Sequence, residues 1–382
     1  MKKIGLVSYH RDPNYGTMLQ AFALAHTIKK LGYDCEYLNY YEYKQPTVIK
    51  KILSKIYHTI KRLLKIKGSI EYDFFNNIEF KNIKESFYIF HECFIPYSKK
   101  QFFCNTISTA VNDYDFFIVG SDQTWSEAVN KFGTTINFLD FVKDSNRKRS
   151  YAPSIGTVHI NKNYLDVLLP KLKQFRNLSC RERQNCNLLE SELLDKVEFV
   201  LDPTFLLSPS DWNSYIHEPI IEGKYILAYI LGTRECISKF AEKLGEHNNL
   251  PVYYILTRPE YLSKDNLLKT IGPFDFVNLI ENASFIVTDS FHGTILSINF
   301  EKNFYSFTKR DGSATTIDND RIGTVLQEFE LNDRLLNDEF ANELGSIDYI
   351  RVKSKLENLR ESSLNYLKTD YSICNQLLLN IL

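Results

Sequence analysis

Cysteine is scarce in this chain, and its spacing excludes the usual cysteine-based sites. The seven cysteines are odd in number and scattered, with no C-x-x-C and no Cys/His spacing that suits zinc. Cys180 and Cys186, the closest pair, are interpreted as ordinary thiols. The pattern indicates reduced thiols and no structural metal. The cysteines are Cys35, Cys93, Cys104, Cys180, Cys186, Cys236 and Cys374.

Long apolar runs are also lacking. No span of 18 apolar residues occurs, and the chain enters a predicted strand at Ile4, after too few residues for a signal peptide. We therefore expect a cytoplasmic protein. The formal net charge of −1 argues against a general nucleic-acid binder. A length of 382 residues with 44% hydrophobic content predicts a soluble protein of two domains.

Common metal and nucleotide motifs are absent. The sequence contains no HExxH, no GxxxxGK[ST] and no GxGxxG. It therefore predicts neither a bound metal nor a nucleotide cofactor.

One segment has no acidic residue at all. Residues 44–67 contain seven Lys and one Arg, and their apolar residues recur at spacings of three and four. This pattern predicts a basic amphipathic helix. The helix either anchors the protein on an anionic membrane surface or packs on the first domain with a solvated basic face.

Strand and helix patterns alternate through the first half of the chain. Ile4–Tyr9 is predicted to be a strand, Gly16 a turn, Met18–Leu31 a helix that Gly32 ends, and Cys35–Tyr40 the next strand. Together they predict one βαβ unit with a right-handed crossover. Further strands are predicted at Phe116–Val119, Arg149–Ser154, Leu178–Cys180 and Phe199–Leu201.

The same alternation restarts after Leu207. Residues 208–212 are interpreted as a linker or helix cap. Strands are predicted at Tyr225–Leu231, Val252–Leu256, Phe285–Thr288 and Asn303–Phe307, and helices at Ile237–His247 and Phe276–Asn282. The predicted fold class is α/β, with two Rossmann-like, doubly wound domains facing a cleft in a GT-B-like arrangement. The predicted domains are 1–207 and 208–349, and a helical tail, 350–382, is expected to cross back to the first.

The most informative stretch covers residues 285–294. A buried strand ends in small polar residues, and His292 and Gly293 then open an apolar helix, Thr294–Phe300. In open α/β sheets ligands bind beyond the carboxyl ends of strands, and a helix N-terminus there attracts anions. His292 is therefore predicted to lie beside an anion with a proton that is mobile near neutral pH. The alternative is a capping or satisfied buried histidine.

Five segments together resemble the motifs of one family. They are Asn14–Ala21 (NYGTMLQA), Val119–Trp125 (VGSDQTW), Ser179–Glu182 (SCRE), Leu201–Thr204 (LDPT) and Thr288–Thr294 (TDSFHGT). In sequence and order they resemble the polysaccharide pyruvyl transferase family. The resemblance implies transfer of a pyruvyl group from phosphoenolpyruvate to a sugar of a surface polysaccharide or its lipid-linked precursor. The product is usually a cyclic ketal, and the resemblance implies the same fold.

The resemblance also implies roles for particular residues. His292 matches the catalytic histidine of the family, and Asp122 is a second candidate acid or base, or else a helix N-cap. The donor is expected to meet Arg181, Arg321 and the helix start at Ser290, Gly293 and Thr294. Several members carry Arg at the position of Ser290, so Arg181 and Arg321 are predicted to supply the charge, unless they form structural ion pairs.

The acceptor is expected on the first domain. Its candidate contacts are Asn14, Tyr15, Gly16, Gln20, Ser121 and Gln123. For Gly16 the alternative is a tight turn. Asp202 and Pro203 are interpreted as architectural, and Asp289 as a cap of the His292 helix or a group that orients the imidazole.

Two other functions fit the same frame. One is a GT-B glycosyltransferase using a nucleotide sugar, for which Glu281 or Asp289 would have to bind the ribose. The other is a catalytically silent glycan-binding protein.

Overall fold

The computed structural model describes residues 2–44, 78–130, 136–308, 317–337 and 344–369. The predicted basic helix at 44–67 lies outside the described residues beyond Lys44, as does the tail after Thr369. Among the helices of the described residues, none is long and apolar enough to span a bilayer.

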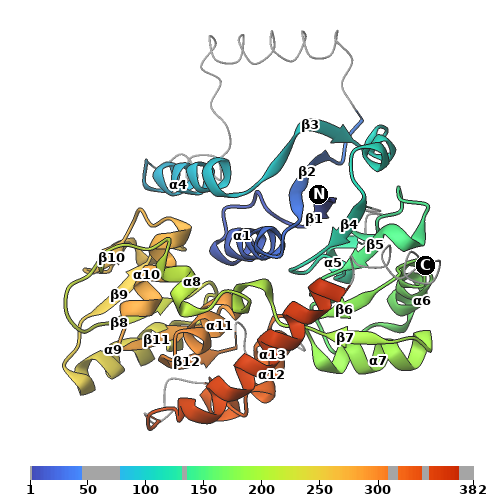
Figure 1. The fold of residues 1–382 in the computed structure, drawn as a ribbon. Helices are drawn as coiled ribbons and strands as arrows, with labels where there is room; N and C mark the ends of the chain where they lie inside the picture. The colour runs from blue at the N-terminus through green and yellow to red at the C-terminus, as the bar shows by residue number, and fades with distance from the viewer. Residues whose placement is uncertain (1, 45–77, 131–135, 309–316, 338–343, 370–382) are drawn as a thin grey trace, which may run out of the picture.

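A five-stranded parallel sheet forms the first half of the molecule (Figure 1). Its strand order is β3-β2-β1-β4-β5, so the order of the strands reverses between β1 and β4 while all strands stay parallel. The strands are β1 (Lys3–Val7), β2 (Asp34–Tyr41), β3 (Tyr97–Phe103), β4 (Phe116–Val119) and β5 (Lys148–Ser150). Helices α1 (Tyr15–Lys30), α4 (Ile78–Phe94) and α5 (Glu127–Asn130) belong to this half.

A small two-stranded unit extends the first half. Parallel strands β6 (Leu178–Cys180) and β7 (Val197–Phe199) pair with each other, and α6 (Lys162–Leu172) and α7 (Arg183–Leu193) precede and separate them. An isolated bridge between Arg149 and Asn177 joins this unit to β5.

The second half contains a six-stranded parallel sheet of order β10-β9-β8-β11-β12-β13. Its strands are β8 (Ile226–Tyr229), β9 (Val252–Ile255), β10 (Leu267–Leu268), β11 (Phe285–Thr288), β12 (Asn303–Phe307) and β13 (Leu335–Leu336). Its helices are α9 (Glu235–Asn248), α10 (Pro273–Asn282), α11 (Phe291–Asn299) and α12 (Ile317–Glu328). The architecture is thus α/β with two Rossmann-like parts, GT-B-like as predicted.

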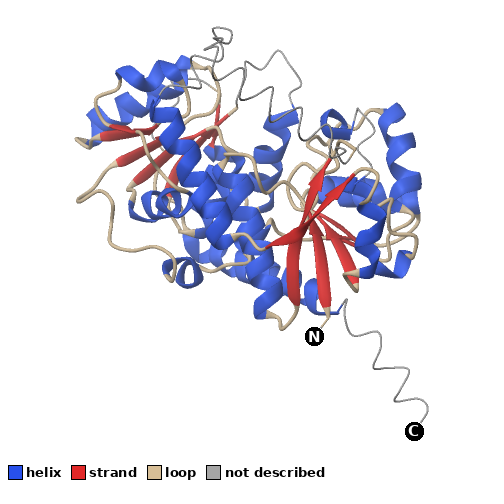
Figure 2. Cartoon of the chain, turned by 90° about the horizontal axis from the view of Figure 1, so that it is seen from above, coloured by secondary structure: helices blue, strands red, loops and turns tan. Residues whose placement is uncertain are grey.

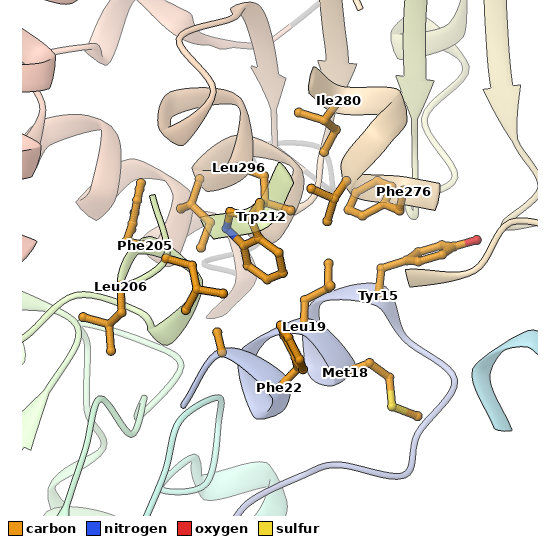
Figure 3. Packing of buried hydrophobic residues seen from close by; sticks show 14 of the residues in the cluster. Tyr15, Met18, Leu19, Phe22, Phe205, Leu206, Trp212, Phe276, Ile280 and Leu296 are labelled. Carbon is orange, nitrogen blue, oxygen red and sulfur yellow. The ribbon is translucent and has the colours of Figure 1, made fainter. Parts of the chain in front are cut away.

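Helices lie between the two sheets (Figure 2), and their apolar side chains form one continuous core. Tyr15, Leu19 and Phe22 of α1 pack toward Phe276 of α10 and Trp212 of α8 (Pro209–Asn213) (Figure 3). Because this core spans both halves, it holds the carboxyl ends of the two sheets in one position.

Helix α13 (Tyr349–Thr369) follows the second half in the chain but bonds to the first. The Tyr366 hydroxyl donates to the Ser150 carbonyl at 2.9 Å, and the Ser363 hydroxyl accepts from the Leu201 N–H at 3.0 Å. Arg360 donates to the Phe205 carbonyl at 2.6 Å. The predicted division of the chain at residue 207 stays a prediction.

The element predictions differ from the structure mainly at their ends. Strands β4, β6, β11 and β12 have the predicted bounds, whereas the strand predicted at Arg149–Ser154 ends at Ser150. Helix α1 begins at Tyr15 because Asn14 caps it by accepting from the Thr17 N–H. Gly16 therefore lies inside the helix, and its predicted turn is wrong.

His10, after β1, and His91, on α4, form a buried pair. This pair is expected to make the free energy of unfolding depend on pH. His10 Nδ1 lies 3.0 Å from His91 Nε2, and burial, with the charges of Arg11 and His91, lowers the pKa of His10 to about 3. His10 is neutral when folded but protonates in the unfolded chain below a pKa of about 6.5. The free energy of unfolding should therefore fall by up to about 1.4 kcal/mol per pH unit from pH 6.5 toward 3.

Urea unfolding at several pH values tests this expectation. His10→Gln should make the free energy of unfolding less dependent on pH, while the same change at the exposed His159 should not. An unchanged slope in His10→Gln would contradict the assignment.

Candidate active site

The candidate residues converge where strands of both sheets end. Asp122 follows β4, Arg181 follows β6 and His292 follows β11, so all three come from the carboxyl ends of parallel strands. In each sheet this edge includes the point where strand order reverses, between β1 and β4 and between β8 and β11. Ligands of open α/β sheets bind at such points.

His292 lies in the first turn of α11. The Ser290 hydroxyl caps this helix by accepting from the Gly293 N–H at 3.4 Å. The imidazole is 8% exposed, and its Nε2 lies 3.8 Å from Asp202 Oδ2. No described residue forms a hydrogen bond with this Nε2. Burial lowers the pKa of His292, and the carboxylates of Asp202 and Asp122 oppose that shift, so the imidazole is neutral near pH 7.

Gly16 leaves the space that the imidazole occupies. A methyl group built on Gly16 would lie 1.9 Å from His292 Nδ1 and 2.3 Å from its Cγ, so only glycine fits here without moving the ring. The N-terminal motif of the first half thereby packs directly on the histidine motif of the second.

Gly16→Ala is therefore expected to lower kcat about 100-fold by displacing the imidazole, since a shift near 1 Å can have this effect. Initial-rate kinetics, with circular dichroism as a fold check, would measure it. Gly323→Ala on α12 is a matched control because its methyl would meet only Leu335, at 3.9 Å. Normal kcat in Gly16→Ala would show that the imidazole tolerates displacement.

Arg181 binds three carboxylates from separate segments. Its guanidinium, 1% exposed, lies 2.6 Å from Asp202 and 3.4 Å from both Asp122 and Glu182. Burial acts to raise the pKa of Asp122, but the charges of Arg181, His292 and Arg321 and the Gln123 N–H lower it overall. Asp122 is therefore ionised at neutral pH, and its Oδ2 accepts from the Thr17 hydroxyl at 3.2 Å.

Arg321 approaches the same site from α12. With the Gln123 amide oxygen oriented toward it, that oxygen accepts from Arg321 Nη1 at 2.9 Å and Nη2 at 2.8 Å. Both arginines lie over the ring of Phe291, Arg181 at 4.4 Å and Arg321 at 5.7 Å from its centroid. The cavity that they border has a volume of about 20 Å³, enough for one water molecule.

Several residues predicted to contact the donor or the acceptor also have partners within the protein, and their ligand contacts stay predictions. Tyr15 donates its hydroxyl to the Ile271 carbonyl at 3.0 Å, and the Gln20 amide donates to the Tyr9 carbonyl at 2.8 Å. The Thr294 hydroxyl lies 2.7 Å from that of Ser306, and a side chain at Gly293 would collide with Thr288. These residues, like the N-cap Asn14, stabilise the local structure of the site.

Ser121 and Asp289 also have defined partners. The Ser121 hydroxyl donates to the Ala152 carbonyl at 2.9 Å and lies 3.3 Å from Asp202. Asp289 accepts from the N–H groups of Leu231 and Gly232 at 2.7 and 2.6 Å. The cap of α11 is therefore Ser290, and the prediction that Asp289 caps this helix is wrong.

Sequence reasoning underestimated Asp202. It was interpreted as architectural, yet its Oδ2 contacts Arg181 and faces His292, and its Oδ1 accepts from Thr204 N–H and hydroxyl at 3.0 and 2.9 Å. The available signal was an acidic residue directly after a strand region in the LDPT motif. Among the described residues no group of three or more His, Cys, Asp or Glu is arranged to hold a metal ion.

The sequence matches a known family, and the fold is similar to those of solved structures. A family model described as polysaccharide pyruvyl transferase matches residues 14–309. No curated protein matches the sequence. The solved UDP-GlcNAc 2-epimerase from Methanocaldococcus jannaschii aligns with 11% identity and a TM-score of 0.47, over 95% of this chain and 92% of its own. The Arabidopsis thaliana protein UGT89C1, complexed with quercetin, aligns with 10% identity and a TM-score of 0.43, over 96% and 92%.

Proposed function

The chain belongs to the polysaccharide pyruvyl transferase family, and from this premise we propose that it transfers a pyruvyl group from phosphoenolpyruvate to a sugar. The acceptor sugar belongs to a surface polysaccharide or its lipid-linked precursor, and the product is a cyclic ketal across two hydroxyls. The observation that carries the proposal is the neutral, buried His292, whose Nε2 faces Asp202 without a hydrogen-bond partner among the described residues.

A neutral imidazole suits the proton balance of this reaction. One acceptor hydroxyl adds to C2 of phosphoenolpyruvate while the C3 methylene gains a proton and becomes a methyl group. A second hydroxyl then displaces phosphate, which carries away the second proton. His292 takes the first hydroxyl proton as a general base, and Asp122 and Asp202 stabilise the imidazolium that forms. The imidazolium passes this proton on to C3, so His292 ends the step neutral.

The donor requires cations near this histidine. Its carboxylate and phosphate together carry several negative charges, which Arg181 and Arg321, both over the Phe291 ring, would offset. Arg181 already faces three carboxylates, so Arg321 is the proposed direct ligand. A cavity of about 20 Å³ is too small for phosphoenolpyruvate, so this cavity cannot hold the donor unless its lining residues move.

Calorimetric titration of phosphoenolpyruvate tests the proposal. The wild type should bind it in the micromolar-to-millimolar range, and Arg321→Ala should bind about tenfold more weakly or not at all. Arg351→Ala is the control, since this exposed arginine on α13 pairs with Glu330. If the wild type binds a nucleotide sugar and no phosphoenolpyruvate, the glycosyltransferase alternative replaces this proposal.

A lipid-linked acceptor would require contact with a membrane. The basic segment 44–67 supports this part of the proposal through its sequence alone. Flotation with anionic liposomes should recover the wild type but not a variant with Lys50, Lys51, Lys55, Lys61 and Arg62 changed to Glu. Equal recovery of both proteins, or of neither, would remove membrane contact from the proposal.

A further inference from the structure

A cavity of about 430 Å³ opens at the carboxyl ends of β1 and β2. It lies on the first sheet at the reversal of strand order between β1 and β4, where open α/β sheets bind ligands. Its volume is that of a small-molecule site. The lining includes Tyr9, Arg11, Asp12, Tyr40, Glu42 and Asn137.

The segment after β1 connects the wall of this cavity with the chain beside Asp122. The Ser8 hydroxyl, at the cavity wall, donates to the Ser121 carbonyl at 3.0 Å, one residue before Asp122. Burial raises the pKa of Tyr9. A hydrogen bond with Asn137 opposes this shift, and the negative charge of Asp122 adds to it. Tyr9 is therefore a neutral hydroxyl donor that lies within electrostatic reach of Asp122.

The charged residues that line the cavity disfavour binding of the anionic donor there. Two carboxylates, Asp12 and Glu42, line it against one cation, Arg11. That guanidinium donates to the Tyr40 carbonyl at 3.0 Å and to the Asn39 side chain, and it lies over the Tyr41 ring. A polyanion such as phosphoenolpyruvate would be repelled here, while Arg181 and Arg321, both over the Phe291 ring, would attract it.

The same lining suits a neutral sugar. The carboxylates accept hydrogen bonds from vicinal hydroxyls, and the Asn137 amide can both accept and donate. The tyrosine rings supply apolar faces of the kind that sugar rings pack against.

We infer that this cavity is the acceptor-sugar subsite, which presents hydroxyl groups to Asp122 and His292. The inference rests on the proposed function and adds to it a location and a ligand class: an uncharged pyranose. The donor and the acceptor then bind in regions of opposite local charge.

Saturation-transfer NMR with the methyl pyranosides of glucose, galactose, mannose and N-acetylglucosamine tests the inference. At least one of them should bind the wild type, and the double variant Asp12→Asn, Glu42→Gln should bind that glycoside about tenfold more weakly. Glu330→Gln, an exposed carboxylate of the second half, is the control and should bind normally.

The outcomes separate the two proposals. The inference fails if no glycoside binds the wild type, or if the double variant binds the glycoside as tightly as the wild type does. It also fails if the double variant loses affinity for phosphoenolpyruvate, measured by calorimetry, and not for the glycoside. Absence of phosphoenolpyruvate binding by the wild type would overturn the donor assignment, whereas a glycoside signal lost in the double variant would still assign the cavity to a sugar.

Discussion

Replacing His292 with glutamine is expected to reduce kcat for pyruvyl transfer by about 10²–10⁴-fold, the usual contribution of a general acid or base. Glutamine has nearly the reach of the imidazole but cannot exchange a proton in this pH range. The imidazole is neutral and has no hydrogen-bond partner at Nε2 among the described residues, so its replacement breaks no internal bond at this atom. The fold should therefore survive.

Phosphate release with a glycan acceptor, measured beside thermal unfolding, would check this expectation. His26→Gln is the matched control, because His26 is a half-buried histidine of α1 that bonds to Tyr215 away from the site. The pH profile adds an independent test. Since the pKa of His292 is lowered, the wild type should lose kcat/KM only as pH falls below about 6.5, when the base becomes protonated. Turnover retained by His292→Gln would refute the role.

The position of each main candidate at a strand end could be foreseen from the sequence, but their convergence could not. Asp122, Arg181 and His292 each follow a predicted strand, and ligands of open α/β sheets bind at the carboxyl ends of strands. The three strands belong to three different sheets, so it is the packing of the two halves that brings the residues together. Strand bounds were also predictable where β-branched or aromatic runs end at polar residues, as Phe285–Thr288 does before Asp289.

Helix α1 shows why the acceptor residues could not be placed in the same way. All of its residues from Tyr15 to Ala25 are buried, because the helix packs on β2 of its own half and on α10 and α11 of the second half. Periodicity distinguishes a buried face from an exposed one, so it says nothing about a helix that is covered all round. The Gln20 amide donates to Ser8 and Tyr9 in the segment after β1, and its predicted contact with the ligand stays a prediction.

Gly16 and Asp202 illustrate a second limit. Each acquires its role from residues far away in sequence, Gly16 from His292 and Asp202 from both Arg181 and His292. A local pattern offers only a turn for the glycine and a helix cap or hinge for the aspartate. Only the packing of the two halves shows that the N-terminal glycine shapes the space for a histidine in the other half.

Asp202→Asn should be the most destabilising single substitution at this site, lowering the free energy of unfolding by about 3–5 kcal/mol. Asp202 is buried, and its two oxygens accept from Arg181 on one side and Thr204 on the other. An asparagine has one oxygen and one NH₂ group, so one of these donors would face another donor. Arg181 would then keep only carboxylates at 3.4 Å.

A double-mutant cycle separates structural from catalytic effects of Asp202. Urea unfolding of Asp202→Asn, Arg181→Met and the double variant should give a coupling of a few kcal/mol, as expected for a buried pair that loses one partner. The exposed pair Glu330 and Arg351 serves as the control, with coupling close to zero. Because Asp202 also faces His292, the double variant should recover stability without recovering turnover. If turnover returned with stability, Asp202 would be a structural partner of Arg181 and the imidazolium would depend on Asp122 alone.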